Sequence, residues 1–177
     1  MPEFKNRENA RHTLPDGRIV WESRSCAVSC IVEAFMGGER YVALGRRGPK
    51  TPDPEFRGKF GLVCGYVDWD ENTFGSALRE IWEELGLNVS DPEKWQFERQ
   101  PYYVSSDPSP PNHRQNITLR YFFTIACDEL PELSAANSED GEIAELAWIP
   151  TSDALNLNLA FRHNEVLKSY LLRVCGV

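Results

Sequence analysis

The sequence has little positive charge, no long apolar run and no C-x-x-C pair. It contains 19 Lys and Arg against 27 Asp and Glu, so its formal net charge is −8 and its pI is near 5.0. This balance argues against binding duplex DNA through a broad basic face, although divalent metals can bring an acidic protein to a polyphosphate. No apolar run approaches about 18 residues, so neither a membrane span nor a membrane partner is expected. The polar N-terminal segment lacks the apolar core of a signal peptide, which favours a cytoplasmic location.

The five cysteines are an odd number, and each lies in an apolar segment. Buried free thiols are therefore favoured over disulfides or a zinc site.

With 177 residues, of which 41% are hydrophobic and 26% charged, the chain has the size and composition of one soluble domain spanning 1–177. Residues 1–20 form a polar lead-in, and Asp16-Gly17 is a turn signal compatible with a small hairpin.

Apolar periodicity and turn residues divide the chain into strands and two main helices. Strands are expected at 25–36, 41–47, 59–67, 95–106, 116–127 and 144–150, and helices at 73–86 and 160–175. Gly37 and Gly38 mark a hairpin turn, whereas 105–115 is predicted to be an irregular loop because it is rich in Pro and Ser. The order of these elements predicts an α/β sandwich around a mixed sheet.

The helix expected over 73–86 separates apolar from acidic residues around its axis. Thr73 is the expected N-cap, and Gly86 is the expected left-handed C-terminus. At about 100° per residue, the apolar side collects Phe74, Leu78, Ile81, Trp82 and Leu85. The opposite side carries three carboxylates, those of Glu80, Glu83 and Glu84.

Carboxylates at positions i, i+3 and i+4 repel one another, because their Cβ atoms lie within about 5–6 Å on a helix surface. Such a face is usually solvated surface, but a hard divalent cation would relieve the repulsion, and Mg²⁺ takes oxygen ligands. Arg79 flanks the face and can hold one carboxylate by a two-point hydrogen bond. The helix is therefore a candidate metal-binding element.

The spacing around this helix resembles the Nudix box, G-x5-E-x7-R-E-U-x-E-E-x-G-U, in which U is apolar. Gly65, Glu71 and the segment REIWEELGL at 79–87 fill every defined position. The resemblance implies a Nudix-type α/β/α sandwich and metal-dependent hydrolysis of a nucleoside diphosphate linked to another moiety, such as ADP-ribose or a related sugar nucleotide. It implies Mg²⁺ or Mn²⁺ as the cofactor and a small nucleotide as the partner, and family members often form homodimers.

The resemblance also assigns roles to individual positions. The metal-binding positions of the family fall on Glu80, Glu83, Glu84 and the backbone carbonyl of Cys64. Gly65 matches the glycine whose missing Cβ lets the loop approach the metal, and Arg79 and Glu71 match the ion pair that braces the acidic face. Water attacks phosphorus in line, activated by a box glutamate, here Glu83, or by an acid of a distal loop. The distal-loop candidates are Glu139, Asp140, Glu142 and Glu145, with Glu142 favoured and solvated loop charges as the alternative.

Two further segments resemble the ADP-ribose pyrophosphatase-like branch of the family. The sequence LAFRHNEVL at 159–167 is similar to L-A-F-D-H-x-x-I-L, with Arg162 in place of Asp, and the segment 105–123 is similar to S-D-P-x-R-D-x-R followed by a strand. His163 either contacts a ligand or packs in the core. Two alternatives remain open: a sensor that binds such a ligand without cleaving it, and a hydrolase of dinucleoside polyphosphates or capped RNA.

Basic and aromatic residues supply the candidate substrate contacts. Basic residues border the loop over 47–58, where they could hold outer phosphates or serve as solvating charges. Four aromatic residues are candidates for stacking on a base, with packing as the alternative: Trp69, Tyr102, Tyr103 and Phe161. The candidate substrate-binding set is Arg46, Arg47, Arg57 and Tyr103.

Overall fold

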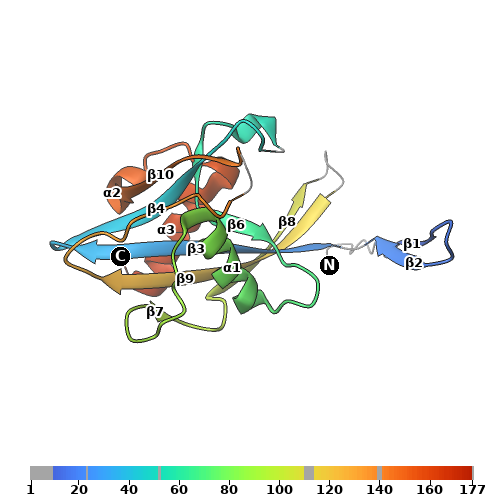
Figure 1. The fold of residues 1–177 in the computed structure, drawn as a ribbon, viewed down its shortest axis with the longest axis horizontal. Coiled ribbons are helices and arrows are strands. Elements are labelled where there is room, and N and C mark those ends of the chain that lie inside the picture. Colours follow the sequence, from blue (N-terminus) through green and yellow to red (C-terminus); the bar gives the residue numbers. More distant parts are fainter. Residues whose placement is uncertain (1–9, 23, 52, 110–113, 139–140, 177) are drawn as a thin grey trace, which may run out of the picture.

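The computed structural model describes residues 10–22, 24–51, 53–109, 114–138 and 141–176. Within these ranges the strands form one eight-stranded mixed sheet and a separate two-stranded hairpin. The hairpin consists of β1 (Ala10–Thr13) and β2 (Ile19–Glu22) and lies apart from the main sheet (Figure 1). It turns at Gly17, which has a φ of +84°, so the turn expected at Asp16-Gly17 is confirmed.

The strand β3 lies at the centre of the main sheet. It pairs in parallel with β9 and antiparallel with β4 and β6, and the main path through the sheet is β10-β4-β3-β9-β7. Three strands lie off this path, because β5 pairs with β4, β6 with β3, and β8 with β9. The bounds of these strands are β3 (Ser25–Met36), β4 (Glu39–Arg47), β5 (Phe60–Gly61), β6 (Val63–Tyr66), β7 (Gln96–Phe97), β8 (Tyr103–Ser109), β9 (Arg114–Ala126) and β10 (Ile143–Pro150).

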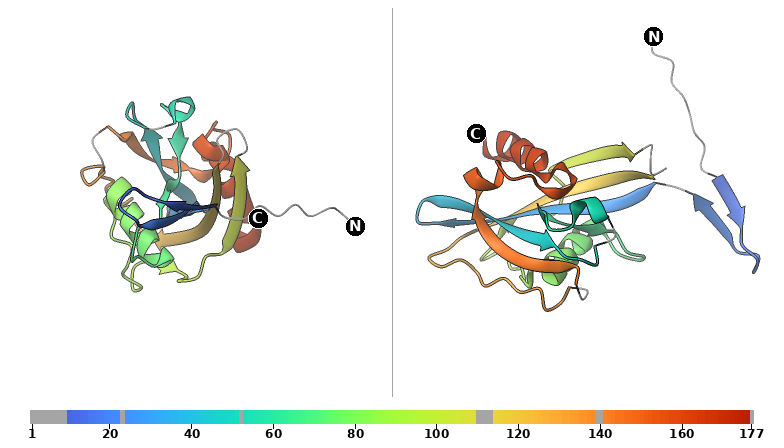
Figure 2. Two further views of the ribbon diagram at one scale, coloured as in Figure 1. Left: turned by 90° about the vertical axis from the view of Figure 1, so that its right-hand side faces the viewer. Right: turned by 90° about the horizontal axis from the view of Figure 1, so that it is seen from above.

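Helices cover both faces of this sheet (Figure 2). The helix α1 (Thr73–Leu85) packs on one face over a hydrophobic core that includes Val28. The helices α2 (Thr151–Ala154) and α3 (His163–Tyr170) pack on the other face over a second core that includes Ile31. This arrangement confirms the expected α/β/α sandwich around a mixed sheet.

The strand β3 is apolar along most of its length because both of its faces are covered. Val28 and Val32 belong to the core beneath α1, whereas Ile31 belongs to the core beneath α3. Even-numbered residues of β3 thus face α1, and odd-numbered residues face the α3 side. The strand expected at 25–36 and the glycine turn that follows it are confirmed.

The N-terminus of α1 differs from the prediction by one residue. The N-cap is Asn72, whose Oδ1 accepts a hydrogen bond of 2.9 Å from the backbone N–H of Gly75. Thr73 lies inside the helix, and its hydroxyl instead pairs with the Tyr121 hydroxyl at 2.8 Å. The C-terminus is as expected, because Gly86 has a φ of +69° and donates its N–H to the Trp82 carbonyl.

Two strand predictions need correction. The strand expected at 59–67 is divided at Leu62, whose N–H leaves the ladder and donates to His163. The prediction of an irregular loop at 105–115 is wrong for 105–109, which belong to β8, and for 114–115, which belong to β9. Pro108 is tolerated there because β8 is an edge strand that pairs only with β9 among the described strands. The expected strand at 95–106 is likewise split into β7 and the start of β8.

The C-terminal helix expected at 160–175 consists of three consecutive pieces. A 3₁₀ turn at Ala160–Arg162 precedes α3, and a π-helical turn at Leu171–Cys175 follows it. The five cysteines are free thiols, as expected, but Cys30 alone is fully buried and the other four are partly buried. No helix within the described ranges has the length and apolar run needed to cross a membrane.

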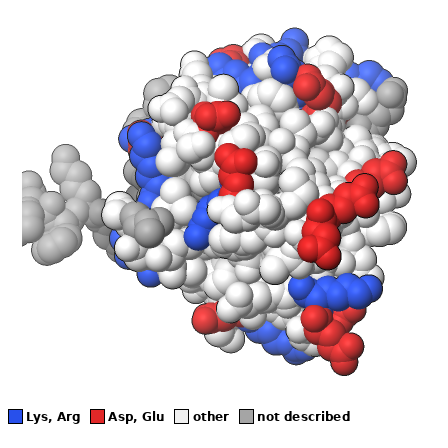
Figure 3. Space-filling model, turned by 90° about the vertical axis from the view of Figure 1, so that its left-hand side faces the viewer, with Lys and Arg blue, Asp and Glu red and all other residues white. Residues whose placement is uncertain are grey.

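The charges at one end of the sandwich are mixed in sign. Figure 3 shows acidic and basic side chains interspersed around a broad area of uncharged residues, with no single basic field in this view. A surface of this kind fits the formal net charge of −8.

Candidate active site

The loop between β6 and α1 brings the sheet against the acidic side of the helix. Gly65 faces Glu80 so closely that a Cβ built on Gly65 would overlap the Glu80 carboxylate. The missing side chain of Gly65 therefore makes room for this carboxylate, which is only 8% exposed as a residue. The sequence prediction was that Gly65 lets the loop approach a metal, and in the structure the group that fills this space is the Glu80 side chain.

Arg79 connects the acids of this segment. Its Nε and Nη2 donate to the two carboxylate oxygens of Glu71, at 3.1 and 3.2 Å. Its Nη1 donates to Glu80 Oε1 and to Glu83 Oε2, each at 2.8 Å, and its Nη2 also reaches the Tyr66 carbonyl at 3.0 Å. The expected ion pair between Arg79 and Glu71 is thus formed, and the same guanidinium also contacts two of the expected metal ligands.

Glu71 also holds the loop itself. Its Oε2 accepts hydrogen bonds from the Ser76 hydroxyl and, at 3.3 Å, from the backbone N–H of Asp68. Arg79 and these two donors hold the pKa of Glu71 below its usual range, against the opposing effect of burial. Glu71 is therefore a structural anion that joins the loop to the helix.

Glu84 and Cys64 meet on the side of β6 that faces away from β3. The Val67 N–H donates to the Cys26 carbonyl at 3.0 Å, and bonded and non-bonded positions alternate along an antiparallel pair. Cys64 therefore occupies a non-bonded position opposite Ser29, and its N–H and C=O both point away from β3. Accordingly, the Cys64 N–H lies 3.5 Å from Glu84 Oε1, which makes a long hydrogen bond.

Burial and mutual repulsion raise the pKa values of the two buried carboxyl groups in this cluster, those of Glu80 and Glu84. Burial, opposed by Arg79 and assisted by Glu83 and Glu142, raises the pKa of Glu80 to about 7. Burial, together with the negative charges of Glu80 and Glu142, raises the pKa of Glu84 well above its usual range. A bound cation would favour the ionised form of both carboxylates.

These donors fit a hard divalent cation. Carboxylate oxygens and a backbone carbonyl are the ligands that Mg²⁺ takes. Among the described residues, the buried Glu84 carboxylate accepts a single long hydrogen bond, from Cys64. Among the residues that the structure describes, no three His, Cys, Asp or Glu side chains already converge as a metal-binding group. Arg79 explains this arrangement, because it holds Glu80 and Glu83, so those two side chains would turn from Arg79 to reach a metal.

The distal loop contributes one acid to the cluster. Glu142 acts electrostatically on both Glu80 and Glu84, and its backbone carbonyl accepts a hydrogen bond of 2.6 Å from the Gly48 N–H. Glu145 instead forms an ion pair of 2.8 Å with Arg46, and both side chains are strongly exposed. The other two candidates, Glu139 and Asp140, lie outside the described residues.

The three predicted arginines have different environments. Arg47 packs its guanidinium over the Phe161 ring at 5.0 Å, and its charge acts on Glu84. Its buried Nε has no hydrogen-bond partner among the residues that the structure describes. Arg46 is held by the ion pair described above and lies over Phe60. Arg57 donates twice to the Thr51 carbonyl, at 3.2 and 3.1 Å, which braces its own loop. Arg47 is the predicted arginine that the fold brings to the carboxylates.

The aromatic candidates also divide into packed and exposed residues. Phe161 packs against Phe56 with ring centroids 4.2 Å apart, whereas Trp69 is 97% exposed at the tip of the loop before α1. Two guanidinium groups pack over the Tyr103 ring, those of Arg120 at 5.1 Å and Arg173 at 4.5 Å from its centroid.

Sequence reasoning did not single out Arg120, whose guanidinium lies over the ring of the predicted substrate-binding residue Tyr103. The alternation of the segment 116–127 does place Arg120 on the polar side of its strand, but its neighbours lie on other strands. His163 is buried, and its Nδ1 accepts a hydrogen bond of 2.9 Å from the Leu62 N–H. This contact supports the packing alternative for His163.

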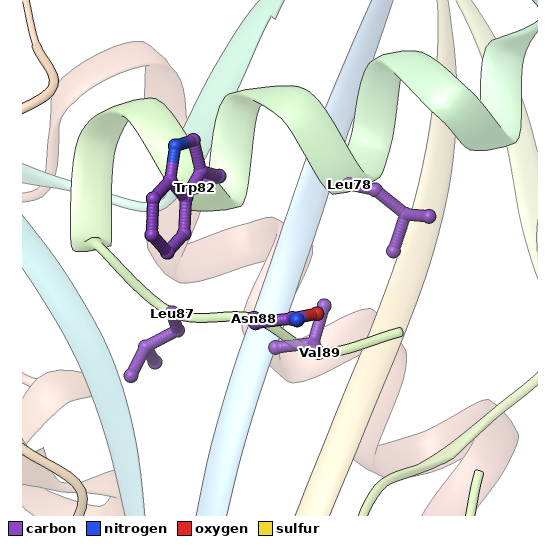
Figure 4. Close-up of a pocket in the computed structure, with 5 residues that line it drawn as sticks. All are labelled: Leu78, Trp82, Leu87, Asn88 and Val89. Carbon is purple, nitrogen blue, oxygen red and sulfur yellow. The ribbon is translucent and has the colours of Figure 1, made fainter. Parts of the chain in front are cut away.

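A separate apolar pocket lies on the other side of α1. Leu78, Trp82, Leu87, Asn88 and Val89 line a cavity of about 220 Å³ (Figure 4). Leu78 and Trp82 lie on the helix side opposite Glu84, so the pocket is distinct from the carboxylate cluster.

Comparison with known proteins identifies the family. The family model described as the NUDIX domain matches residues 24–170, so the chain belongs to the NUDIX domain family. The chain is 24% identical over 133 residues to dihydroneopterin triphosphate diphosphatase of Haemophilus influenzae, covering 71% of this chain and 77% of that protein. Together the family and this relative define the protein as a hydrolase that acts on pyrophosphate bonds.

Solved structures support the same fold. The NUDIX domain of Shewanella oneidensis NrtR in complex with ADP ribose superposes with a TM-score of 0.68 at 18% identity, covering 90% of this chain and 92% of that one. A binary complex of the C. elegans Ap4A hydrolase superposes with a TM-score of 0.63 at 14% identity, covering 86% of this chain and 99% of that one. Divalent metal ions are the general cofactors of hydrolases in this family.

Proposed function

We propose that this pyrophosphohydrolase cleaves a nucleoside diphosphate linked to another moiety, with ADP-ribose or a related sugar nucleotide as the first candidate substrate. The observation that carries the proposal is the buried pair of carboxyl groups at Glu80 and Glu84, whose pKa values are raised by burial and mutual repulsion and which lies beside Arg47. Such a pair suits a divalent metal, and the neighbouring arginine suits the phosphate groups of a substrate.

The proposed metal is Mg²⁺ or Mn²⁺, held by Glu80, Glu83, Glu84 and the Cys64 carbonyl. When bound, it supplies positive charge that neutralises the diphosphate and polarises a phosphorus–oxygen bond. The role of Arg79 is to hold Glu71 in place and to keep the Glu80 and Glu83 carboxylates aligned beside the glycine loop.

The remaining steps use side chains around this cluster. Arg47, whose Nε has no partner in the described part of the chain, binds an outer phosphate and keeps the reacting phosphorus in position. Glu142 accepts a proton from the attacking water, because it is the described acid of the distal loop that acts on both buried carboxylates. Water attacks phosphorus directly, so no covalent enzyme intermediate forms.

Hydrolysis of a panel of nucleotides in Mg²⁺ or Mn²⁺ tests this proposal. The panel contains ADP-ribose, a dinucleoside tetraphosphate, dihydroneopterin triphosphate and capped RNA, with products separated by chromatography. The NrtR structure with ADP ribose supports the first compound, and the names of the other two relatives support the second and third. Release of AMP from ADP-ribose is the expected result, and faster turnover of another compound would reassign the substrate.

A ligand sensor is the second candidate, because the solved structure of the NrtR domain contains bound ADP ribose. The complete set of box glutamates favours catalysis over sensing in this chain. Calorimetry with ADP-ribose separates the two functions: tight binding without turnover of any compound in the panel would support a sensor.

A further inference from the structure

One row of side chains crosses the α3 side of the sheet and begins at the proposed metal site. The strand register places Cys64 of β6 opposite Ser29 of β3, Ser29 beside Arg120 of β9, and Arg120 opposite Tyr103 of β8. Residues paired in this way lie on the same face of a sheet. Cys64, Ser29, Arg120 and Tyr103 therefore form one continuous row, which we call the Arg120 row.

A second row of mostly small side chains runs beside it. The same register aligns Tyr66, Ala27, Thr118 and Ser105 across these four strands. Tyr66 is 46% exposed, so an aromatic ring is accessible at the β6 end of this row, whereas Tyr103 lies at the β8 end of the Arg120 row. Ala27, Thr118 and Ser105 lie between them and are each partly exposed, so a ligand can reach this row from solvent.

Polar atoms in the Arg120 row lack protein partners. Ser29 is only 3% exposed, and its hydroxyl has no hydrogen bond within the described structure. The same holds for the buried Nε of Arg120, whose Nη2 donates to the Ser105 hydroxyl at 3.2 Å. No described carboxylate forms an ion pair with Arg120, although the chain has a net charge of −8. Unpaired buried donors of this kind favour a ligand that supplies acceptors.

We propose that the Arg120 row binds the base of the nucleotide substrate and that Arg120 selects a base with adjacent oxygen and nitrogen acceptors, such as a 6-oxopurine, over adenine. Within the proposed class of sugar nucleotides, this selection places a compound with a 6-oxopurine base ahead of ADP-ribose, which is then hydrolysed more slowly. The inference rests on the proposed function, because Cys64 places the reacting phosphate at the start of the row. Arg120 lies two strand spacings from Cys64, or about 10 Å, a distance that the sugar of a nucleotide can bridge.

The chemistry of arginine explains the selection. A guanidinium offers only donors, and a 6-oxopurine presents its O6 and N7 acceptors side by side, so that the two groups can form paired hydrogen bonds. Adenine presents an amino donor beside N7, which opposes a guanidinium donor. The Tyr103 ring is already covered by the guanidinium groups of Arg120 and Arg173, so the exposed Tyr66 is the aromatic residue on which either purine can stack, and this stacking does not discriminate between them.

The test compares GDP-glucose with ADP-glucose, which differ only in the base. The wild-type protein is expected to have a kcat/KM for GDP-glucose about tenfold or more above that for ADP-glucose, the scale of one paired arginine contact. In the Arg120→Met variant this ratio falls toward one, mainly through a higher KM for GDP-glucose. The Arg99→Met variant is the matched control, because Arg99 lies over Phe74 on the other face of the sheet.

The outcomes separate this proposal from the proposed function. A ratio that stays the same in Arg120→Met and in wild type would overturn the role of Arg120, while hydrolysis itself would continue. If neither sugar nucleotide is hydrolysed, calorimetry with GMP and AMP tests base selection directly. The wild type is then expected to bind GMP more tightly than AMP, whereas Arg120→Met is expected to bind the two with similar affinity. Equal binding of GMP and AMP to the wild type would overturn the proposal. Thermal unfolding of each variant checks that the fold is retained.

Discussion

Gly65 and Glu80 occupy adjoining space, such that a Cβ on Gly65 would overlap the Glu80 carboxylate. The strand β6 and the helix α1 can approach each other here only because position 65 has no side chain. The same approach buries Glu80 and raises its pKa to about 7, mainly through loss of solvation. One glycine therefore controls both the position and the electrostatics of a proposed metal ligand.

The first prediction concerns this glycine. The Gly65→Ala variant must displace Glu80, so we expect kcat to fall by about tenfold or more, the lower end of the effect of a catalytic group. Gly75→Ala is the matched control, because its added Cβ would meet atoms no closer than 3.5 Å in the first turn of α1. Steady-state kinetics and thermal unfolding are the measurements. Equal activity of the two variants would show that Glu80 need not occupy its present position.

The second prediction concerns the box glutamates. Glu83→Gln and Glu84→Gln keep the size of the side chain and remove its charge, so we expect an intact fold and a kcat lower by about two or more orders of magnitude. Glu93→Gln, on the exposed segment after α1, is the control and should retain full activity. Near-full turnover by either box variant would contradict the assignment of that residue as a metal ligand.

The helix α1 could be predicted from the sequence because its signals are local. The period of the apolar residues and the spacing from Gly65 to Gly86 are both read along the chain, and the carboxylate face follows from them. The predicted N-cap, Thr73, was wrong by one residue because Asn and Thr both cap helices. The contact that distinguishes them is the long-range hydrogen bond between the Thr73 and Tyr121 hydroxyls, which the sequence does not reveal.

Features that depend on strand pairing could not be read from the sequence in the same way. The role proposed for Arg120 depends on the strand register, which aligns residues of four strands that are distant in the chain. The segment 105–109 looked irregular because it contains Pro108, and its place at the edge of the sheet is set by tertiary structure.

The third prediction concerns the metal. A cation that binds only the folded protein stabilises it, by about 2.7 kcal/mol at a hundredfold excess over Kd. We therefore expect Mg²⁺ or Mn²⁺ to raise Tm by about 5–10 °C for a chain of this size, and EDTA to reverse the rise. The increase should be largely lost in Glu84→Gln. An equal increase in this variant would place the bound metal elsewhere.

The fourth prediction concerns His163, whose Nδ1 accepts the hydrogen bond from Leu62 where the edge of the sheet is divided. Burial, assisted by the positive charges of Arg120 and Arg47, lowers the pKa of His163 to about 3, against a usual value of about 6.5. Between these two pH values the unfolded chain binds more protons at this residue than the folded chain. The free energy of unfolding therefore decreases as the pH falls from about 6.5 toward 3, and the contribution of the neutral imidazole is complete above pH 6.5.

Urea unfolding at pH 7 and at pH 4.5 measures this effect. At pH 4.5, about two units below the unfolded pKa, the loss attributable to His163 is about 2–3 kcal/mol. His163→Asn is the informative variant, because its side-chain carbonyl can still accept from the Leu62 N–H but does not titrate. The variant should lose less stability than the wild type between the two pH values, whatever its stability at pH 7. Identical losses in both proteins would mean that His163 is protonated in the folded state, contrary to its burial beside two arginines.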